Sequence, residues 1–600
     1  MDKKNTFIGI VIVGAAFALM LWQGKQAQEA QQEQALLQQA EQQLEETAPA
    51  IPEAPKASTT QKTSTLFQQN TKHDHEADLS GSSEEEATYA LENEYIQVLF
   101  TNLGGAIKTV GLKKYPAIQD EPAPFRFNEG SNVPALGIST TDAETAGPQQ
   151  YAPAYALVQQ DDNTITFRLT TQEGLVIERA YDITQGDSGR DPYVIVHETR
   201  FANNMEHAAD LKHIYLHLGT VPPVKNDKMG EFLNFGYYNG EKAKFIKIGE
   251  FQGRSGFMGI GKKLPVDSVE ENTSPILWGS LKNQFFTGVL TPKKPSIGFF
   301  VSPEDLPIEG DASETEMGIA ASMKFDLGQL PAGETSILTT DYYVGPKEYT
   351  RLEKLGENQD LVMQFGIFGF ISKLLLIMMK GIYSIIPNYG VAIIIVTAII
   401  KLLTWPLTNA STRASKKMAK LQGPLKELRE KHKDNPQKAQ QESMKLFKEY
   451  KVNPAAGCLP ILIQIPVFLG LFWMLRSASE LRFAHFLWIQ DLSLPDTMAV
   501  IAGFPLNILP LFMGVTMFFQ MKLTPSPSAD PIQRKVFQFM PFIFLVICYN
   551  FPSGLVLYWT VQNLLTITQQ TITNRRADPI ADAIPTTLAE TRKNKKRRKK

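Results

Sequence analysis

The chain has 600 residues, a formal net charge of −2, 43% hydrophobic residues and 20% charged residues. This length is several times that of a typical domain, so more than one structural unit is expected. The composition excludes a collagen, a disordered tail and a small disulfide-linked scaffold. A net charge near zero also argues against a uniformly basic surface, and no direct, sequence-specific nucleic-acid binding is expected. The averages are those of a soluble protein, but the apolar and basic residues are unevenly distributed along the chain.

The N-terminal segment is predicted to be a transmembrane helix over residues 5–24, which are uncharged and follow Lys3 and Lys4. Twenty such residues can cross a hydrocarbon core of about 30 Å. A cleaved signal peptide is the alternative, but the apolar stretch continues to Trp22 without an evident small-residue cleavage site. Residues 25–87 are rich in Gln, Glu, Ala, Ser and Thr with few aromatic residues, which predicts a flexible acidic linker.

Residues 88–345 consist of short β-type runs separated by Gly, Asn and Pro, a pattern typical of an all-β sandwich. One predicted hairpin joins Thr164–Thr170 to Leu175–Tyr181. His213 and His217 could share a strand face there, but no further ligand type accompanies them, so no metal site is expected. The sequence therefore predicts a large β-sandwich domain over 88–345.

The C-terminal region contains five predicted transmembrane spans, at about 388–408, 456–475, 503–522, 536–551 and 553–573. Residues 346–387 precede them and are predicted to form an interfacial amphipathic helix, because Lys373 and Lys380 are seven residues apart on one face. A further full span there is the alternative. The fold class expected is a multi-domain membrane protein: an N-terminal transmembrane anchor, an external all-β sandwich, and a five-helix α-helical core over 388–575.

The basic residues indicate the orientation of these spans. Between residues 409 and 455 there are 12 basic and 5 acidic residues, and residues 574–600 carry 10 basic and 3 acidic residues. Lys and Arg are enriched in loops on the cytoplasmic side. We therefore expect a cytosolic helical hairpin at 412–451, a basic cytosolic tail at 576–600, cytoplasmic N- and C-termini, and residues 25–387 outside.

A polar face is predicted inside the membrane. Thr397, Lys401, Thr404 and Thr408 follow 4, 3, 4 spacing, which places them on one helix face. Such a face either bonds helix to helix or lines a hydrated cavity. A lysine that snorkels to the membrane surface is the alternative for Lys401. The full set of predicted groove residues is Thr397, Lys401, Thr404, Thr408, Gln464, Thr516, Gln520, Trp559, Gln562 and Asn563.

Enzymatic chemistry has no candidate residues in the sequence. The run from Gly256 to Lys263 matches a phosphate loop in part, but it has Lys where Ser or Thr should hold magnesium, and Leu264-Pro265 follows. No catalytic residue, cofactor or metal is therefore expected.

Three segments carry a family resemblance. They read KVNPAAGCLPILIQIPVF from Lys451, MGVTMFFQ from Met513 and FPSGLVLYW from Phe551. They closely resemble the YidC membrane-protein insertase family, together with its mitochondrial oxidase-assembly and chloroplast Albino relatives, and the likeness is densest over residues 345–575. The predicted sandwich also fits the Gram-negative type with a large periplasmic domain, through Trp278–Thr287 and Tyr343–Tyr349.

The resemblance implies an insertase of the bacterial inner membrane. Nascent membrane-protein segments would enter a hydrophilic groove from the cytosol, alone or with the Sec translocon. Lys401 falls where many members carry Arg, so the charge is kept and the planar guanidinium is lost. Thr397 and Trp559 fall where members contact the substrate. The hairpin and the tail resemble regions implicated in substrate and ribosome contact, and a role in topology and attraction to anionic lipids alone is the alternative for the tail.

Two other functions stay open from the sequence. A small-solute transporter or channel could use the same cavity, although it would be expected to show paired charges or a path open to both sides. The external domain could instead be the active part, as a carbohydrate-binding or chaperone-like sandwich on a membrane anchor.

Overall fold

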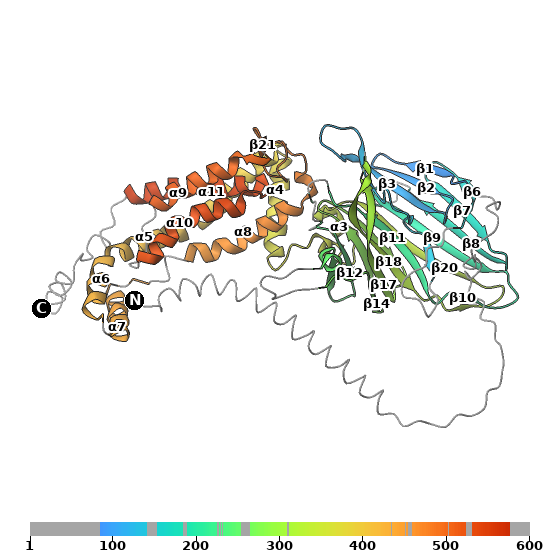
Figure 1. Cartoon of the computed structure of the whole chain (residues 1–600), viewed down its shortest axis with the longest axis horizontal. Coiled ribbons are helices and arrows are strands. Elements are labelled where there is room, and N and C mark those ends of the chain that lie inside the picture. The colour runs from blue at the N-terminus through green and yellow to red at the C-terminus, as the bar shows by residue number, and fades with distance from the viewer. Residues whose placement is uncertain are drawn as a thin grey trace, which may run out of the picture.

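The computed structural model describes residues 85–140, 153–183, 189–224, 227, 230, 232–253, 264–308, 311–433, 435–450, 452–453, 459–501, 503–523 and 531–575. The predicted anchor at 5–24, the tail at 576–600 and nearly all of the linker at 25–87 lie outside these residues, as does the Gly256–Lys263 run. Within them, a β-sheet domain and a bundle of helices lie end to end along the long axis (Figure 1).

The β domain is built from antiparallel sheets, which confirms the predicted sandwich. Its nine-stranded sheet has the order β13-β12-β15-β16-β20-β9-β8-β7-β6. The bounds are β6 (Ala156–Gln160), β7 (Thr164–Thr170), β8 (Leu175–Asp182), β9 (Val194–Asn203), β12 (Asn234–Tyr238), β13 (Ala243–Lys247), β15 (Trp278–Lys282), β16 (Phe286–Pro292) and β20 (Thr335–Pro346).

Two smaller sheets complete the sandwich, with orders β14-β17-β18-β11-β5 and β1-β2-β3-β4. Their strands are β1 (Thr88–Glu92), β2 (Ile96–Thr101), β3 (Ala106–Pro116), β4 (Pro124–Phe127), β5 (Ile138–Thr140), β11 (Ile214–Val221), β14 (Val269–Glu271), β17 (Gly298–Ile308) and β18 (Asp311–Phe325). The short strands β10 (Ala209–Asp210) and β19 (Gln329–Leu330) pair with each other, and the short helix α2 (Gly249–Gln252) follows β13.

Alternation along β8 shows why these residues form a strand. Leu175, Ile177, Arg179 and Tyr181 are buried, while the residues between them are partly exposed. Arg179 is a charged residue in this core, and it donates to the carbonyl oxygens of Gly104 (2.7 Å) and Leu136. A buried charge of this kind is tolerated only when hydrogen bonds replace its lost hydration.

The two predicted neighbours His213 and His217 are separated in the structure. His213 lies exposed before β11, whereas His217 is buried in that strand. Ser139 Oγ lies 2.6 Å from His217 Nε2, and Ser322 Oγ lies 2.7 Å from Nδ1. Burial, with the nearby Arg179 charge, lowers the pKa of His217 to about 4, so the imidazole is neutral in the fold.

The helical part contains α3 (Tyr349–Lys354), α4 (Gly369–Tyr383), α5 (Tyr389–Lys420), α6 (Gln422–Lys431), α7 (Pro436–Glu449), α8 (Leu459–Ser477), α9 (Ile508–Leu523), α10 (Pro531–Cys548) and α11 (Ser553–Arg575). The 3₁₀ turn η1 (Gln359–Met363) lies between α3 and α4, and the 3₁₀ turn η3 (Ser479–Leu481) follows α8. Helix α11 packs between α5 and α9, and α10 packs on α9. Among the described residues, α5 alone has the length and hydropathy of a full membrane span, while α9 and Phe539–Cys548 are shorter apolar helices.

Three helices have bounds that differ from those of the predicted spans. The span predicted over 503–522 starts with a β-hairpin, β21 (Thr497–Ile501) and β22 (Phe504–Asn507), and its helix begins only at Ile508. Gly503 adopts a positive φ of 81°, and Pro505 disfavours helical geometry at the residue before it. Helix α5 continues beyond 408 to Lys420, because no helix-breaking residue follows Pro406, and α10 occupies 531–548 rather than 536–551.

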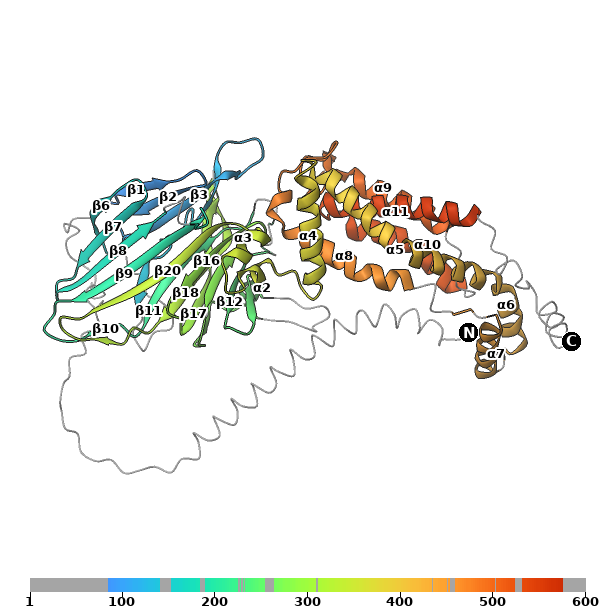
Figure 2. The same ribbon diagram turned by 180° about the vertical axis from the view of Figure 1, so that it is seen from behind.

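Helix α4 lies across the bundle near the sandwich (Figure 2). Its two lysines form ion pairs on the side of the sandwich, Lys373 with Asp360 at 2.5 Å and Lys380 with Glu480 at 2.8 Å. Phe370 and Ile377 are exposed. The helix is therefore amphipathic, with one face on protein and an apolar face left uncovered.

Hydrogen bonds and ion pairs join the sandwich to the helices. Arg482, after α8, donates to the carbonyl oxygens of Pro116 (2.8 Å) and Ala117 (2.7 Å) at the end of β3. Glu348, after β20, accepts from Tyr115 Oη at 2.8 Å and lies 3.8 Å from Lys380 Nζ. These partly buried contacts link the two parts through several elements rather than through a single linker.

The buried neutral imidazole of His217 predicts a pH-dependent stability. Its pKa is lower in the fold than in the unfolded chain, so the unfolded state binds more protons between about pH 4 and 6.5. Stability should therefore fall as the pH is lowered through that range, by about 3 kcal/mol from this residue. His217→Gln should reduce the dependence when urea unfolding is followed by tryptophan fluorescence at pH 7 and 4.5, and the rest remains because burial also lowers the pKa of His197. The half-exposed His207→Gln should leave it unchanged, and equal slopes in the two variants would contradict the assignment.

Candidate functional site

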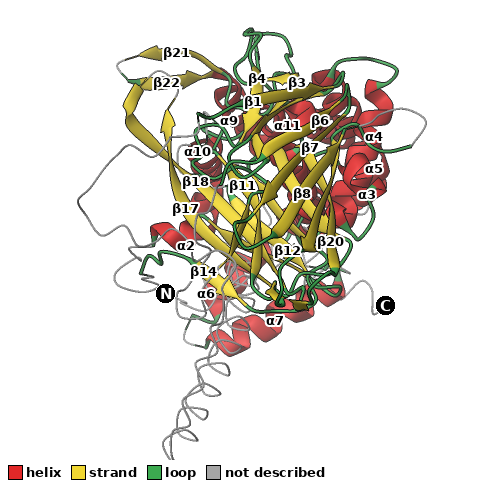
Figure 3. Ribbon diagram, turned by 90° about the vertical axis from the view of Figure 1, so that its right-hand side faces the viewer, coloured by secondary structure: helices red, strands yellow, loops and turns green. Residues whose placement is uncertain are grey.

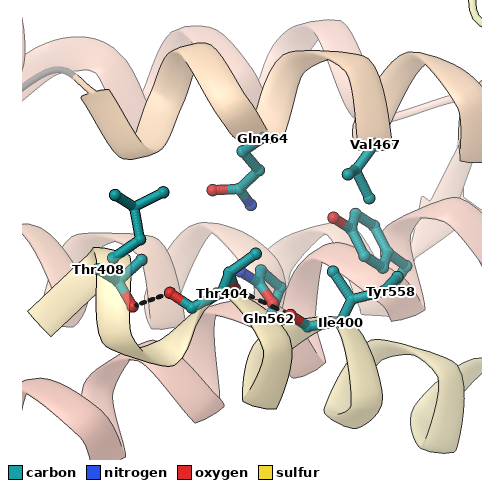
Figure 4. Close-up of a pocket in the computed structure, with 8 residues that line it drawn as sticks. Ile400, Thr404, Thr408, Gln464, Val467, Tyr558 and Gln562 are labelled. Atoms are coloured by element: carbon teal, nitrogen blue, oxygen red, sulfur yellow. Dashed lines mark hydrogen bonds between the residues drawn. The ribbon is translucent and has the colours of Figure 1, made fainter.

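A small cavity lined by both polar and apolar side chains lies between helices α5, α8 and α11 (Figure 4). The space inside it that a water-sized sphere can occupy is about 20 Å³, and the volume is about 360 Å³ when the open solvent at its mouth is counted. Polar and apolar side chains from all three helices line it: Ile400, Thr404, Leu407, Thr408, Gln464, Val467, Tyr558 and Gln562. The amide of Gln464 and the hydroxyl of Tyr558 point into the space between the helices (Figure 4).

The threonines of α5 are satisfied within their own helix. Thr397, Thr404 and Thr408 donate to the carbonyl oxygens four residues earlier, at 2.6, 2.9 and 3.0 Å. This back-bonding uses the hydroxyl proton and leaves the oxygen as an acceptor. Thr408 uses that capacity, because Gln569 Nε2 of α11 donates to its Oγ1 at 2.7 Å. The threonines therefore present acceptors to the neighbouring helix and to the cavity.

Lys401 lies in the seam between α5 and α11 and is only 2% exposed. Its Nζ donates to Thr566 Oγ1 at 2.8 Å, and Thr566 in turn donates to the carbonyl oxygen of Gln562 at 2.7 Å. No carboxylate of the described residues pairs with this ammonium. The contact with Thr566 does not support the snorkelling alternative, because the side chain lies buried against a neighbouring helix.

Gln562 brings an unsatisfied acceptor to the same place. Its Oε1 is buried and accepts no hydrogen bond from the part of the chain that the structure describes. A buried acceptor left without a donor costs free energy. The cavity thus offers a hydrogen-bonding position to a polar group that enters it, one helical turn from the Lys401–Thr566 contact.

The ten residues predicted for one groove are divided among several places. Thr404, Thr408, Gln464 and Gln562 line the cavity, and Lys401 lies in the adjacent seam. Thr516 faces Asn563 between α9 and α11, where Asn563 Nδ2 donates to Thr516 Oγ1 at 3.2 Å. Thr397 is buried on α5, and Gln520 lies on α9 and does not line the cavity.

Trp559 also lies away from the cavity lining. Its ring packs edge-on against Phe468 of α8, with centroids 4.7 Å apart, and against Phe544 of α10 at 5.0 Å. Consecutive residues of a helix point about 100° apart, so Trp559 and Tyr558 face different neighbours. The sequence reasoning overlooked Tyr558, although its four-residue spacing from Gln562 places both on one face of α11.

The fold and the cavity define a class: a protein with a large β-sandwich domain joined to a bundle of apolar helices, one of them long enough to span a membrane, with polar side chains between the helices. Residues 88–378 match the YidC periplasmic domain, and residues 381–580 match the 60Kd inner membrane protein family. The membrane protein insertase YidC of Syntrophus aciditrophicus is 34% identical over 509 residues, which cover 82% of this chain and 86% of the relative.

A second relative, the membrane protein insertase YidC of Haemophilus influenzae strain PittEE, is 32% identical over 81% of this chain and 85% of its own length. The chain therefore belongs to the YidC membrane protein insertase family. Among solved structures, an active YidC insertase with its first transmembrane domain resolved covers 83% of this chain and 94% of its own, with 19% identity and a TM-score of 0.32.

The seam contact predicts a measurable effect of Thr566. Thr566→Val removes the acceptor of the Lys401 ammonium and should lower the stability of the protein in detergent by about 1 kcal/mol. Thr566→Ser keeps the hydroxyl and should retain most of that stability. Thr568→Val is the matched control, since Thr568 is exposed on the same helix. Thermal unfolding followed by tryptophan fluorescence measures all three, and an equal loss in the two valine variants would refute the contact.

Proposed function

We propose that this insertase takes nascent hydrophobic segments from the cytosol into the inner membrane through the cavity between α5, α8 and α11. The observation that supports this most is the buried Lys401 ammonium, which has no carboxylate partner among the described residues and adjoins the polar cavity. An ionisable group at that depth is costly and marks a functional position. The insertase family of the chain supports the same function.

The physical task is to move the polar flank of a substrate across a hydrocarbon layer. Polar side chains such as Gln464 and Gln562 replace part of the water that this flank loses. The Lys401 charge attracts acidic residues in the flank, because Coulomb attraction is stronger where water is scarce. The hydrophobic part of the substrate then partitions into lipid, and burial of its apolar surface supplies the driving force without a nucleotide.

The proposed topology places the sandwich and residues 25–387 on the periplasmic side, with both termini in the cytoplasm. It also includes the N-terminal anchor and five spans built on α5, α8, α9, α10 and α11. The excess of basic residues at 409–455 and 574–600 supports this orientation.

The α6–α7 pair and the basic tail would then face the ribosome and anionic lipids, and the Sec translocon is a proposed partner for some substrates. Charge supports contact with the ribosome and with lipids, because the α6–α7 pair and the tail are basic whereas the ribosomal surface and the inner leaflet are anionic. The two relatives described above are both named as membrane protein insertases, which does not support the alternative of a solute transporter or channel.

The groove charge predicts substrate-dependent insertion. Lys401→Ala should slow insertion of single-span substrates with acidic translocated tails about tenfold, equivalent to about 1.4 kcal/mol, and should affect neutral tails much less. Lys401→Arg should be tolerated, because the charge is kept. The measurement is protease protection of the translocated tail in proteoliposomes.

Lys417→Ala is the matched control, since it removes the same charge from the last turn of the same helix. Full activity of Lys401→Ala on acidic tails would exclude the role of the groove charge. An equal loss for acidic and neutral tails would show that Lys401 acts on the structure of the seam instead.

A further inference from the structure

The β21–β22 hairpin between α8 and α9 is an apolar element that the insertion mechanism does not use. Its strands pair from Thr497 with Asn507 to Ile501 with Phe504. Every residue of β21 is exposed. The four large apolar side chains are 55–66% exposed: Met498, Val500, Ile501 and Phe504. An exposed apolar patch of this kind is unfavourable in water and usually marks a site of contact with another protein or with a membrane.

We propose that this hairpin is a lipid-binding element, which places its apolar side chains in the leaflet on the sandwich side of the membrane. The first argument is continuity with the surface of the bundle. The hairpin leads directly into α9, whose Phe512, Val515 and Phe519 are also exposed. On an apolar helix of a membrane protein, such residues face the acyl chains. The hairpin therefore extends one continuous apolar surface towards the sandwich.

The second argument is charge. From Thr497 to Gln520 the sequence contains no Asp, Glu, Lys or Arg. A docking site for a soluble protein usually has a polar, charged rim around its apolar centre, and the hairpin has none within its own strands. An uncharged apolar tip fits the acyl-chain boundary of a bilayer.

The third argument is the aromatic residue beside the hairpin. Trp488 is partly exposed, and its Nε1 donates to Asp496 Oδ2 at 3.2 Å, directly before β21. Its ring lies 6.3 Å from that of Phe512 on α9. Tryptophan with an apolar ring and a satisfied polar edge is typical of the membrane–water boundary. Asp496 also accepts from the backbone N–H of Leu509 at 2.6 Å, which fixes the start of α9 at this level.

The backbone of the hairpin limits its depth. Two strands alone leave the N–H and C=O groups of both outer edges unpaired, and hydrocarbon offers them no partner. The hairpin should therefore lie at the boundary between headgroups and acyl chains, with its side chains pointing inward. In Figures 1 and 2 it lies at the same end of the bundle as α4. Figure 3, seen from the sandwich, shows it on the other side of the molecule from α4.

Two apolar elements thus flank the bundle at one level, the exposed face of α4 and the β21–β22 hairpin. The proposal does not rest on insertase activity, because lipid contact is measured without a substrate.

The experiment uses the full chain with Cys458 and Cys548 replaced by Ser, after insertion by this variant has been confirmed. A single cysteine at Ile501→Cys or Ile337→Cys carries an environment-sensitive NBD fluorophore. Ile337 is the matched control, because it is a 53% exposed isoleucine on β20 of the sandwich. The protein is reconstituted in phosphatidylcholine–phosphatidylglycerol vesicles whose nitroxide quencher is placed near the glycerol backbone or in the middle of the acyl chain.

We expect the label at 501 to be quenched severalfold more than the label at 337, and more by the shallow nitroxide than by the deep one. The quenching should persist at high salt and without phosphatidylglycerol, because the hairpin is uncharged. Equal, weak quenching at 501 and 337 would overturn the proposal. A blue-shifted but unquenched label at 501 would also overturn it, and a dependence on protein density would then assign the hairpin to contact with a second copy.

A second variant tests insertion of the hairpin itself rather than its proximity to lipid. With the label at Met498→Cys, the Val500→Asp and Ile501→Asp substitutions together should reduce quenching to the level of the 337 control. An unchanged midpoint of thermal unfolding would show that the fold is intact. Unchanged quenching in the folded aspartate variant would show that the apolar side chains do not hold the hairpin in the bilayer.

Discussion

The need to satisfy polar groups where water is scarce governs the helical part of this protein. Lys401 is the most demanding case, since its ammonium lies buried between two helices and bonds to Thr566. Thr566 in turn donates to a backbone carbonyl oxygen of α11, and about two turns further along α5 the pair Thr408–Gln569 makes the same kind of contact. These bonds hold α5 and α11 together along one edge. The cavity lies beside this edge, where the third helix, α8, brings Gln464 opposite them.

The sandwich is held to this bundle by polar contacts of a different kind. Arg482 binds two carbonyl oxygens at the end of β3, and Lys380 of α4 lies between Glu348 and Glu480. Burial raises the pKa of Glu480, and the ammonium of Lys380 opposes that shift. Removing one partner of an ion pair that is partly shielded from water destabilises a protein more than removing one partner of an exposed pair. These contacts therefore fix the position of the helical bundle relative to the β domain.

Much of this architecture follows from local patterns in the sequence. Short β-type runs between turn residues, such as Leu175–Tyr181, predict the sandwich, because the two-residue period of a strand is a local property of the chain. Absence of charge was a poorer guide near residue 503, because an apolar hairpin and an apolar helix have the same composition. For the site, spacing identified the polar edge of α5. Residue spacing alone does not predict that Asn563 faces α9 and Gln562 faces the cavity. Those directions depend on which helix packs on each side of α11.

The length of α5 has a mechanical consequence. Its 32 residues form an unbroken helix of about 48 Å, well beyond the roughly 30 Å of a hydrocarbon core. The same rod carries Lys401 in its first half and ends at the α6–α7 pair. A torque or tilt applied at α6 and α7 is therefore delivered to the Lys401–Thr566 contact without an intervening joint, apart from the bend that Pro406 permits. A partner that binds at the C-terminal end of α5 would therefore act with a long lever arm on the Lys401–Thr566 contact.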